Sequence, residues 1–139
     1  MNSVGQRLLK AHSFLATAEK CLETRDWESA ASRAYYAAYH ASAAFLEWHP
    51  NVPEKPSDEW REKEIRTGLA RYFAPKLRGK KRAHELFWEL LGTRIAGDYR
   101  VGSLGSQRAV NSVKIAKELI QMIEDELVRL GAIPHGEGE

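Results

Sequence analysis

The sequence predicts an all-α fold, a bundle of four or five helices, and three observations support this fold class. Apolar residues recur at three- and four-residue intervals through most of the 139 residues, which is the periodicity of amphipathic helices. No segment shows sustained alternation of apolar and polar residues or an Asn-Gly hairpin signal. The five prolines fall at positions 50, 53, 56, 75 and 134, so residues 1–49 and 76–133 contain none of these helix breakers.

The first two helices are expected over residues 6–24 and 26–48. The second opens at Asp26, a residue type that caps helix N-termini well. Eight alanines lie between positions 30 and 44, and small side chains let a neighbouring backbone approach closely. We therefore expect the second helix to lie in the centre of the bundle or at a contact between subunits.

A loop is expected after the second helix, because three prolines lie within residues 49–57. Ser57 or Asp58 is expected to cap a third, shorter helix that ends at Pro75 and Gly79.

The remaining helices are expected over about 80–100 and over 107–130, the latter capped by Ser106. The long first, second, fourth and fifth helices would form the core. The sequence thus predicts one domain over residues 1–133 and a frayed tail over 134–139.

The composition excludes several function classes. A single cysteine, Cys21, leaves no internal disulfide framework and no CxxC metal or redox motif, and it fits a reducing compartment. No apolar run approaches the ~18 residues of a membrane span, and the N-terminus lacks a signal-peptide core. The histidines are scattered, and the GSLGS segment lacks the lysine of a phosphate loop. We therefore expect a cytoplasmic protein with no membrane partner, no metal site and no cofactor.

Two basic residues, Arg33 and His40, share one face of the alanine-rich helix at a separation of seven residues. On a helix this apolar, each side chain requires a polar partner. One interpretation is structural, with Arg33 paired to a carboxylate of another helix and His40 a satisfied core histidine. The other is functional, because an imidazole with a pKa near 6.5 transfers protons at neutral pH.

A second polar pair ends the apolar stripe of the fourth helix. Phe87, Leu91, Arg94 and Asp98 follow one face, and Tyr99 lies beside them. Arg94 and Asp98 stand four residues apart, the spacing at which helical side chains meet. The pair is either an ordinary ion pair or, because it continues a core-facing stripe, a partly buried one.

Charge is concentrated in one segment. Residues 61–82 hold nine basic and two acidic side chains, a net of +7, which leaves −5 on the rest of a chain whose total is +2. Such a patch either contacts phosphates of a nucleic acid or is a solvated basic loop. Its densest part comprises Lys76, Arg78, Lys80, Lys81 and Arg82.

The run ASRAYYAAYHASAAFL (31–46), followed by TRIAGDY (93–99), resembles the HEPN superfamily. The closer similarity is to small stand-alone HEPN proteins with Arg-x-Tyr-Tyr-Ala in the second helix and Arg-x-x-x-Asp-Tyr in the fourth. This resemblance implies an antiparallel bundle of four long helices plus a short one, which acts as a homodimer. Many relatives are metal-independent endoribonucleases. Some are toxins paired with a minimal nucleotidyltransferase antitoxin that can modify the tyrosine with AMP.

The nucleases of that superfamily carry Arg-x(4–6)-His in a late helix, and here Arg94 is followed by Asp98 and Tyr99 with no histidine. Arg33 and His40 satisfy this spacing numerically, but they lie on the second helix.

The resemblance therefore leaves two hypotheses for the function. The first is an RNA-acting toxin, with Arg33, His40 and Arg94 as catalytic residues and Tyr36, Asp98 and Tyr99 lining a polar cleft. The second is a non-catalytic subunit that docks a nucleotidyltransferase or a nucleotide.

Overall fold

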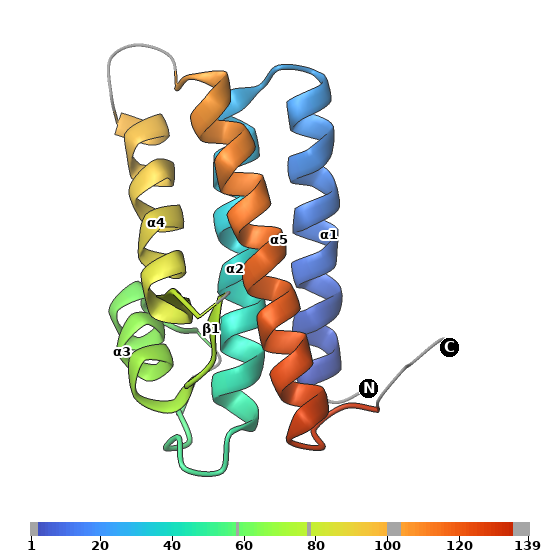
Figure 1. Ribbon diagram of the computed structural model, residues 1–139, viewed down its shortest axis with the longest axis vertical. Helices are drawn as coiled ribbons and strands as arrows, with labels where there is room; N and C mark the ends of the chain where they lie inside the picture. Colours follow the sequence, from blue (N-terminus) through green and yellow to red (C-terminus); the bar gives the residue numbers. More distant parts are fainter. Residues whose placement is uncertain (1–2, 58, 78, 100–103, 135–139) are drawn as a thin grey trace.

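The computed structural model describes residues 3–57, 59–77, 79–99 and 104–134, without the side chains of Asp98 and Tyr99 (Figure 1). Four long helices run side by side and antiparallel, and a short helix and a small hairpin pack at one end of the bundle. The predicted fold class is thus confirmed. In chain order, the elements are α1 (Ser3–Glu23), α2 (Trp27–Trp48), α3 (Glu62–Tyr72), β1 (Lys76–Leu77), β2 (Lys81–Arg82), α4 (Ala83–Tyr99) and α5 (Ser106–Arg129).

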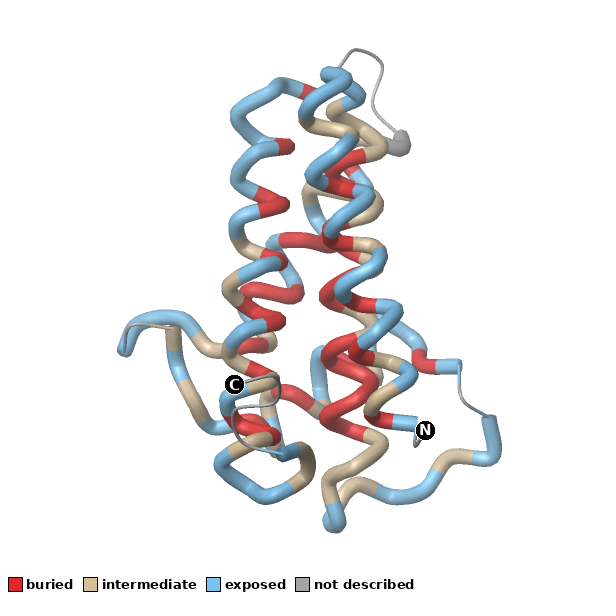
Figure 2. The backbone as a smooth tube through the Cα atoms, turned by 90° about the vertical axis from the view of Figure 1, so that its right-hand side faces the viewer, coloured by how far each residue is buried: buried red, intermediate tan, exposed pale blue. Residues whose placement is uncertain are grey.

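Helix α2 is the central helix of the bundle, as its alanines predict. It packs against α1, α4, α5 and α3, and each of its eight alanines between positions 30 and 44 is at most 1% exposed. Figure 2 shows the buried positions along the inward side of each helix, with exposed positions on the outside. The predicted cap is also confirmed, because Asp26 Oδ1 accepts a hydrogen bond from the Ser29 backbone nitrogen at 3.3 Å.

Helix α3 begins later than predicted. Ser57 does not cap it, since its hydroxyl oxygen accepts a hydrogen bond from the Glu59 backbone nitrogen instead, and Asp58 lies outside the described residues. The first helical residue is Glu62, and Glu64 Oε1 accepts from the Arg61 backbone nitrogen at 2.8 Å. The delay has a tertiary cause, described below, because a tyrosine of α2 binds the backbone just before this helix.

A close approach fixes α3 against α2. A Cβ atom at Gly68 would lie 2.8 Å from Leu46 Cδ2, so only glycine fits at this distance without a shift of the leucine. The contact brings the second half of α3 close to the C-terminal end of α2.

The hairpin formed by β1 and β2 was not predicted. Lys76 and Leu77 pair antiparallel with Arg82 and Lys81, around a turn in which Gly79 has a φ of +72°. Helix α4 therefore begins at Ala83 rather than near residue 80.

The predicted cap of α5 was wrong as well. Gly105 occupies the N-cap position without a side-chain hydrogen bond, and Ser106 is the first helical residue. Within the described ranges, no helix has the length and apolar character needed to cross a membrane.

Candidate functional site

A cavity of about 510 Å³ opens where α2, α4 and the start of α3 meet. It contains two of the predicted site residues, Tyr36 and Arg94, which the fold brings together from different helices. Its lining residues are Tyr35, Tyr36, Tyr39, Glu59, Trp60, Arg61, Glu62, Lys63 and Arg94.

Arg94 sits over the tyrosine rings of α2. Its guanidinium carbon lies 5.1 Å from the ring centroid of Tyr35 and 5.2 Å from that of Tyr36, within cation–π range. Its Nη1 is 3.7 Å from Glu62 Oε1, and the arginine side chain is 22% exposed. Arg94 is thus partly buried, and Phe87 and Leu91 of the same stripe are buried. The expected Arg94–Asp98 pair and the side chain of Tyr99 lie outside the described part.

Tyr35 forms the buried floor beneath this arginine. Its ring packs 5.4 Å from Phe87 and 5.2 Å from Tyr36. Burial raises the pKa of the Tyr35 phenol well above its usual range, and the negative charge of Glu62 acts in the same direction. The phenol therefore stays neutral and supplies no negative charge that would repel an anionic ligand.

Tyr39 fixes the segment just before α3, which forms one wall of the cavity. Its hydroxyl donates to the Trp60 carbonyl at 3.0 Å and accepts from the Trp60 backbone nitrogen at 2.9 Å. This two-way contact keeps the backbone at Trp60 out of the helical hydrogen-bond pattern, which is why α3 starts only after it. The tyrosine thereby sets the position of Arg61, Glu62 and Lys63 at the mouth of the cavity.

His40 lies next to Arg7 of α1. Arg7 Nη1 is 3.0 Å from the imidazole Nδ1, and because arginine can only donate, Nδ1 accepts. The ring stacks on Phe14 at a centroid distance of 5.4 Å. Burial, then the charges of Arg7 and Lys10, lower the pKa of His40 to about 4, against an opposing effect of Glu47. The imidazole is therefore neutral at neutral pH.

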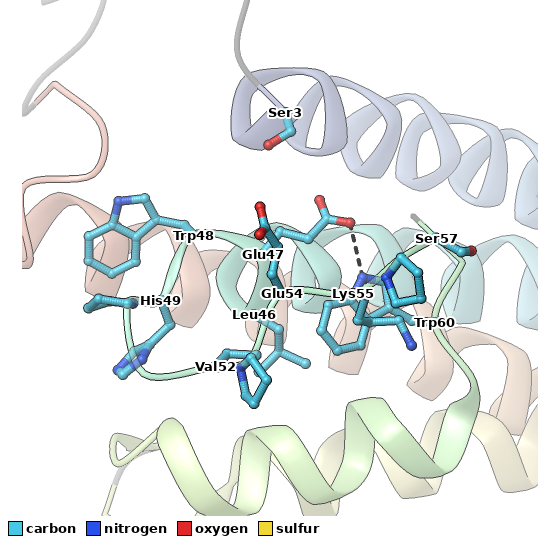
Figure 3. A pocket seen from close by; sticks show the side chains of 13 residues that line it. Ser3, Leu46, Glu47, Trp48, His49, Val52, Glu54, Lys55, Ser57 and Trp60 are labelled. Atoms are coloured by element: carbon cyan, nitrogen blue, oxygen red, sulfur yellow. Dashed lines mark hydrogen bonds between the residues drawn. The ribbon is translucent and has the colours of Figure 1, made fainter.

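Glu47 connects this part of the molecule to the cavity. Its carboxylate accepts hydrogen bonds from Arg7 Nε at 3.2 Å and from Arg7 Nη2 at 2.8 Å. It also accepts from the indole Nε1 of Trp60 at 3.0 Å (Figure 3). This series of hydrogen bonds, from His40 through Arg7 and Glu47, thus reaches Trp60, which lines the Arg94 cavity.

A HEPN domain family model matches residues 4–126. The chain belongs to the HEPN domain family. The match runs from the start of α1 to near the end of α5, and it includes Arg94 and the three tyrosines of α2. No curated protein matches the sequence at a significant level.

Arg33, the other basic residue of α2 in the HEPN domain, is half-buried and makes no hydrogen bond or ion pair with any residue in the described ranges. It shares no hydrogen bond with His40, whose partner is Arg7. Arg7 is the residue that sequence reasoning missed. The available signal was a lone arginine within the buried stripe of Val4, Leu8 and Ala11 on the first helix.

The predicted basic patch of the HEPN domain divides into structural and surface side chains. Arg82 Nη2 donates to the Ala70 and Phe73 carbonyl oxygens at 2.7 and 2.8 Å, so this arginine caps the C-terminal end of α3. Lys81 Nζ is 3.0 Å from Glu89 Oε2. Lys76 and Lys80 are exposed, and Arg78 lies outside the described residues.

A second cavity, also about 510 Å³, lies on the other side of Trp60 along the proline-rich loop and is drawn in Figure 3. Trp48, His49, Lys55 and Glu54 face it, but none of the predicted site residues do. Among the described residues, no group of three or more His, Cys, Asp or Glu side chains is placed to hold a metal ion.

Proposed function

We propose that this HEPN domain is an RNA-acting protein that binds a nucleotide unit of its RNA in the Arg94 cavity. The cavity has the size of a small-ligand site. The partly exposed rings of Tyr36 and Tyr39 are surfaces against which a base packs, and Arg61, Lys63 and Arg94 supply positive charge for a phosphate.

The observation that carries the proposal is the long contact between Arg94 and Glu62. At 3.7 Å it is beyond hydrogen-bond distance, and the Glu62 side chain is 50% exposed. A phosphate oxygen can replace this carboxylate at low cost, because a half-exposed ion pair contributes little to stability. The arginine, in contrast, is held in place over two aromatic rings.

The test is the Arg94→Gln variant, titrated calorimetrically with adenosine monophosphate and with hexaadenylate. We expect its affinity for both ligands to fall about 10- to 100-fold, the size expected for loss of a charge-assisted hydrogen bond. Arg129→Gln is the matched control, since Arg129 pairs with Glu126 at the end of α5, away from the cavity. Equal affinities of the wild type and Arg94→Gln, at unchanged melting temperatures, would overturn the proposal.

Cleavage of the RNA without a metal ion is the finer form of this proposal, with His40, Arg33 and Arg94 as its catalytic residues. To act as a base, His40 must release Nδ1 from Arg7, because the other ring nitrogen of the neutral imidazole carries the hydrogen. With a pKa of about 4, the imidazole stays neutral, so the rate should stay constant as the pH falls to 6 and decline only near pH 4. RNA incubated with the protein and a chelator, with His40→Ala as the comparison, tests it. A rate that halves near pH 6.5, or an unchanged rate in His40→Ala, would argue against His40 as the base.

We also propose, from the family resemblance, that the domain acts as a homodimeric toxin with a nucleotidyltransferase antitoxin. Sedimentation of the chain alone, and mixed with a nucleotidyltransferase encoded beside it, measures both associations. A monomer that does not change its sedimentation in the mixture would contradict this part of the proposal.

A further inference from the structure

A separate cavity of about 520 Å³ lies further along the seam between α3 and α4, and the proposed nucleotide site does not include it. Its main feature is Trp88, which is 52% exposed although it is a large aromatic residue. The guanidinium carbon of Arg66 lies 4.0 Å from the indole centroid, close above the ring. The lining residues are Arg66, Lys81, His84, Glu85, Trp88 and Glu89.

The two cavities are consecutive along the same pair of helices. Glu62 of α3 faces Arg94 of α4 at one point, and Arg66 of α3 faces Trp88 of α4 at the next. Arg94 and Trp88 are six residues apart, about 9 Å along the axis of α4. Each cavity alone has the volume of a site for one small ligand. A ligand that contacts both is therefore larger than one nucleotide.

One cation of α3 lines each cavity. Lys63 lines the first and Arg66 the second, and residues three apart on a helix are neighbours on its surface. In the described part of the chain, neither has an ion-pair partner. The acidic residues of the second cavity do have partners, since Glu89 binds Lys81 and Glu85 accepts from the Arg82 backbone nitrogen at 2.9 Å.

We propose that Trp88 and Arg66 form a second base-binding subsite, so that the ligand is single-stranded RNA laid along the α3–α4 seam. The inference rests on the proposed function for its first subsite. A base stacks on the exposed part of the indole and on the guanidinium plane, both of which are surfaces that bind unpaired bases. The phosphate between the two bases lies against Lys63 and Arg66.

The experiment compares hexaadenylate with adenosine monophosphate on Trp88→Ala, with Ile95→Ala as the control. Ile95 is another exposed apolar residue of α4, 45% exposed, and it lines neither cavity. We expect Trp88→Ala to lose about 5- to 100-fold in affinity for hexaadenylate, the effect of removing one stacked base. Its affinity for adenosine monophosphate, and both affinities of Ile95→Ala, should equal those of the wild type.

A second variant measures the phosphate contact. Arg66→Gln should reduce the slope of log affinity for hexaadenylate against log salt by about 0.7, the contribution of one phosphate on a single strand. Wild-type affinity of Trp88→Ala for hexaadenylate would overturn the second subsite while leaving the Arg94 site intact. If adenosine monophosphate showed no binding that depends on Arg94, the proposed function would instead be overturned. The affinities of Trp88→Ala and the wild type for hexaadenylate would still decide whether the second subsite exists.

Discussion

Replacing Glu47 with glutamine should lower the free energy of unfolding by about 2 to 4 kcal/mol, because it breaks a largely buried ion pair. The Arg7 and Glu47 side chains are only 13% and 18% exposed, so water screens little of their interaction. The same carboxylate accepts the indole hydrogen of Trp60, which lines the Arg94 cavity. We therefore also expect weaker nucleotide binding. Urea unfolding at neutral pH measures the first effect, and calorimetric titration measures the second.

The control for Glu47→Gln is Glu124→Gln. Glu124 also contacts a basic group, His12, but that histidine is half exposed, and the loss should stay below about 1 kcal/mol. Replacing both partners by apolar residues, Arg7→Met with Glu47→Leu, should recover part of the lost stability, since no charge is then left without its counterpart. The recovery is incomplete because His40 Nδ1 and Trp60 Nε1 each lose a hydrogen-bond partner. A Glu47→Gln protein as stable as Glu124→Gln would refute the structural role of this pair.

The Phe87→Ala variant should lose about 3 to 5 kcal/mol of stability, the usual cost of emptying a buried aromatic site. Phe87 is 0% exposed, and its ring supports Tyr35, on which Arg94 rests. The substitution should therefore also weaken ligand binding, whereas an equally destabilising truncation elsewhere in the core should leave ligand affinity unchanged.

Phe45→Ala separates these two effects. Phe45 is equally buried but packs on Phe73, near the C-terminal end of α2 and ten residues after Tyr35. We expect both variants to unfold at clearly lower urea concentrations and only Phe87→Ala to bind adenosine monophosphate more weakly. Equal affinities of the two variants would show that Phe87 does not position the cavity.

Much of the fold follows from local sequence. The helical periodicity, the Asp26 cap and the central, alanine-rich helix were all predicted from residues close together in the chain, and the structure confirms them. One error occurs where a distant residue intervenes. Tyr39 binds the backbone at Trp60, 21 residues away, and delays α3. The pairing of β1 with β2, which delays α4, is local, but each strand has only two residues, too few to show an alternating pattern.

The candidate site shows the same division. Tyr36 and Arg94 were named from the sequence and do line one cavity, but their neighbours Glu62 and Lys63 were not, because nothing local indicates that α3 faces α4 at that point. His40 was expected to act with Arg33, its neighbour on the helix face, whereas its hydrogen-bond partner is Arg7, 33 residues away.

The sequence by itself determined that this chain is helical, where most of its helices lie and which residues share a face. Helical periodicity sets these features through backbone hydrogen bonds and burial within about four residues. Only the tertiary structure decided which faces meet. The rotation and offset of one helix against another depend on packing between side chains far apart in sequence, such as Leu46 against Gly68. That packing places Arg94 over two tyrosines and Arg66 over Trp88, and so forms the seam along which we expect RNA to bind.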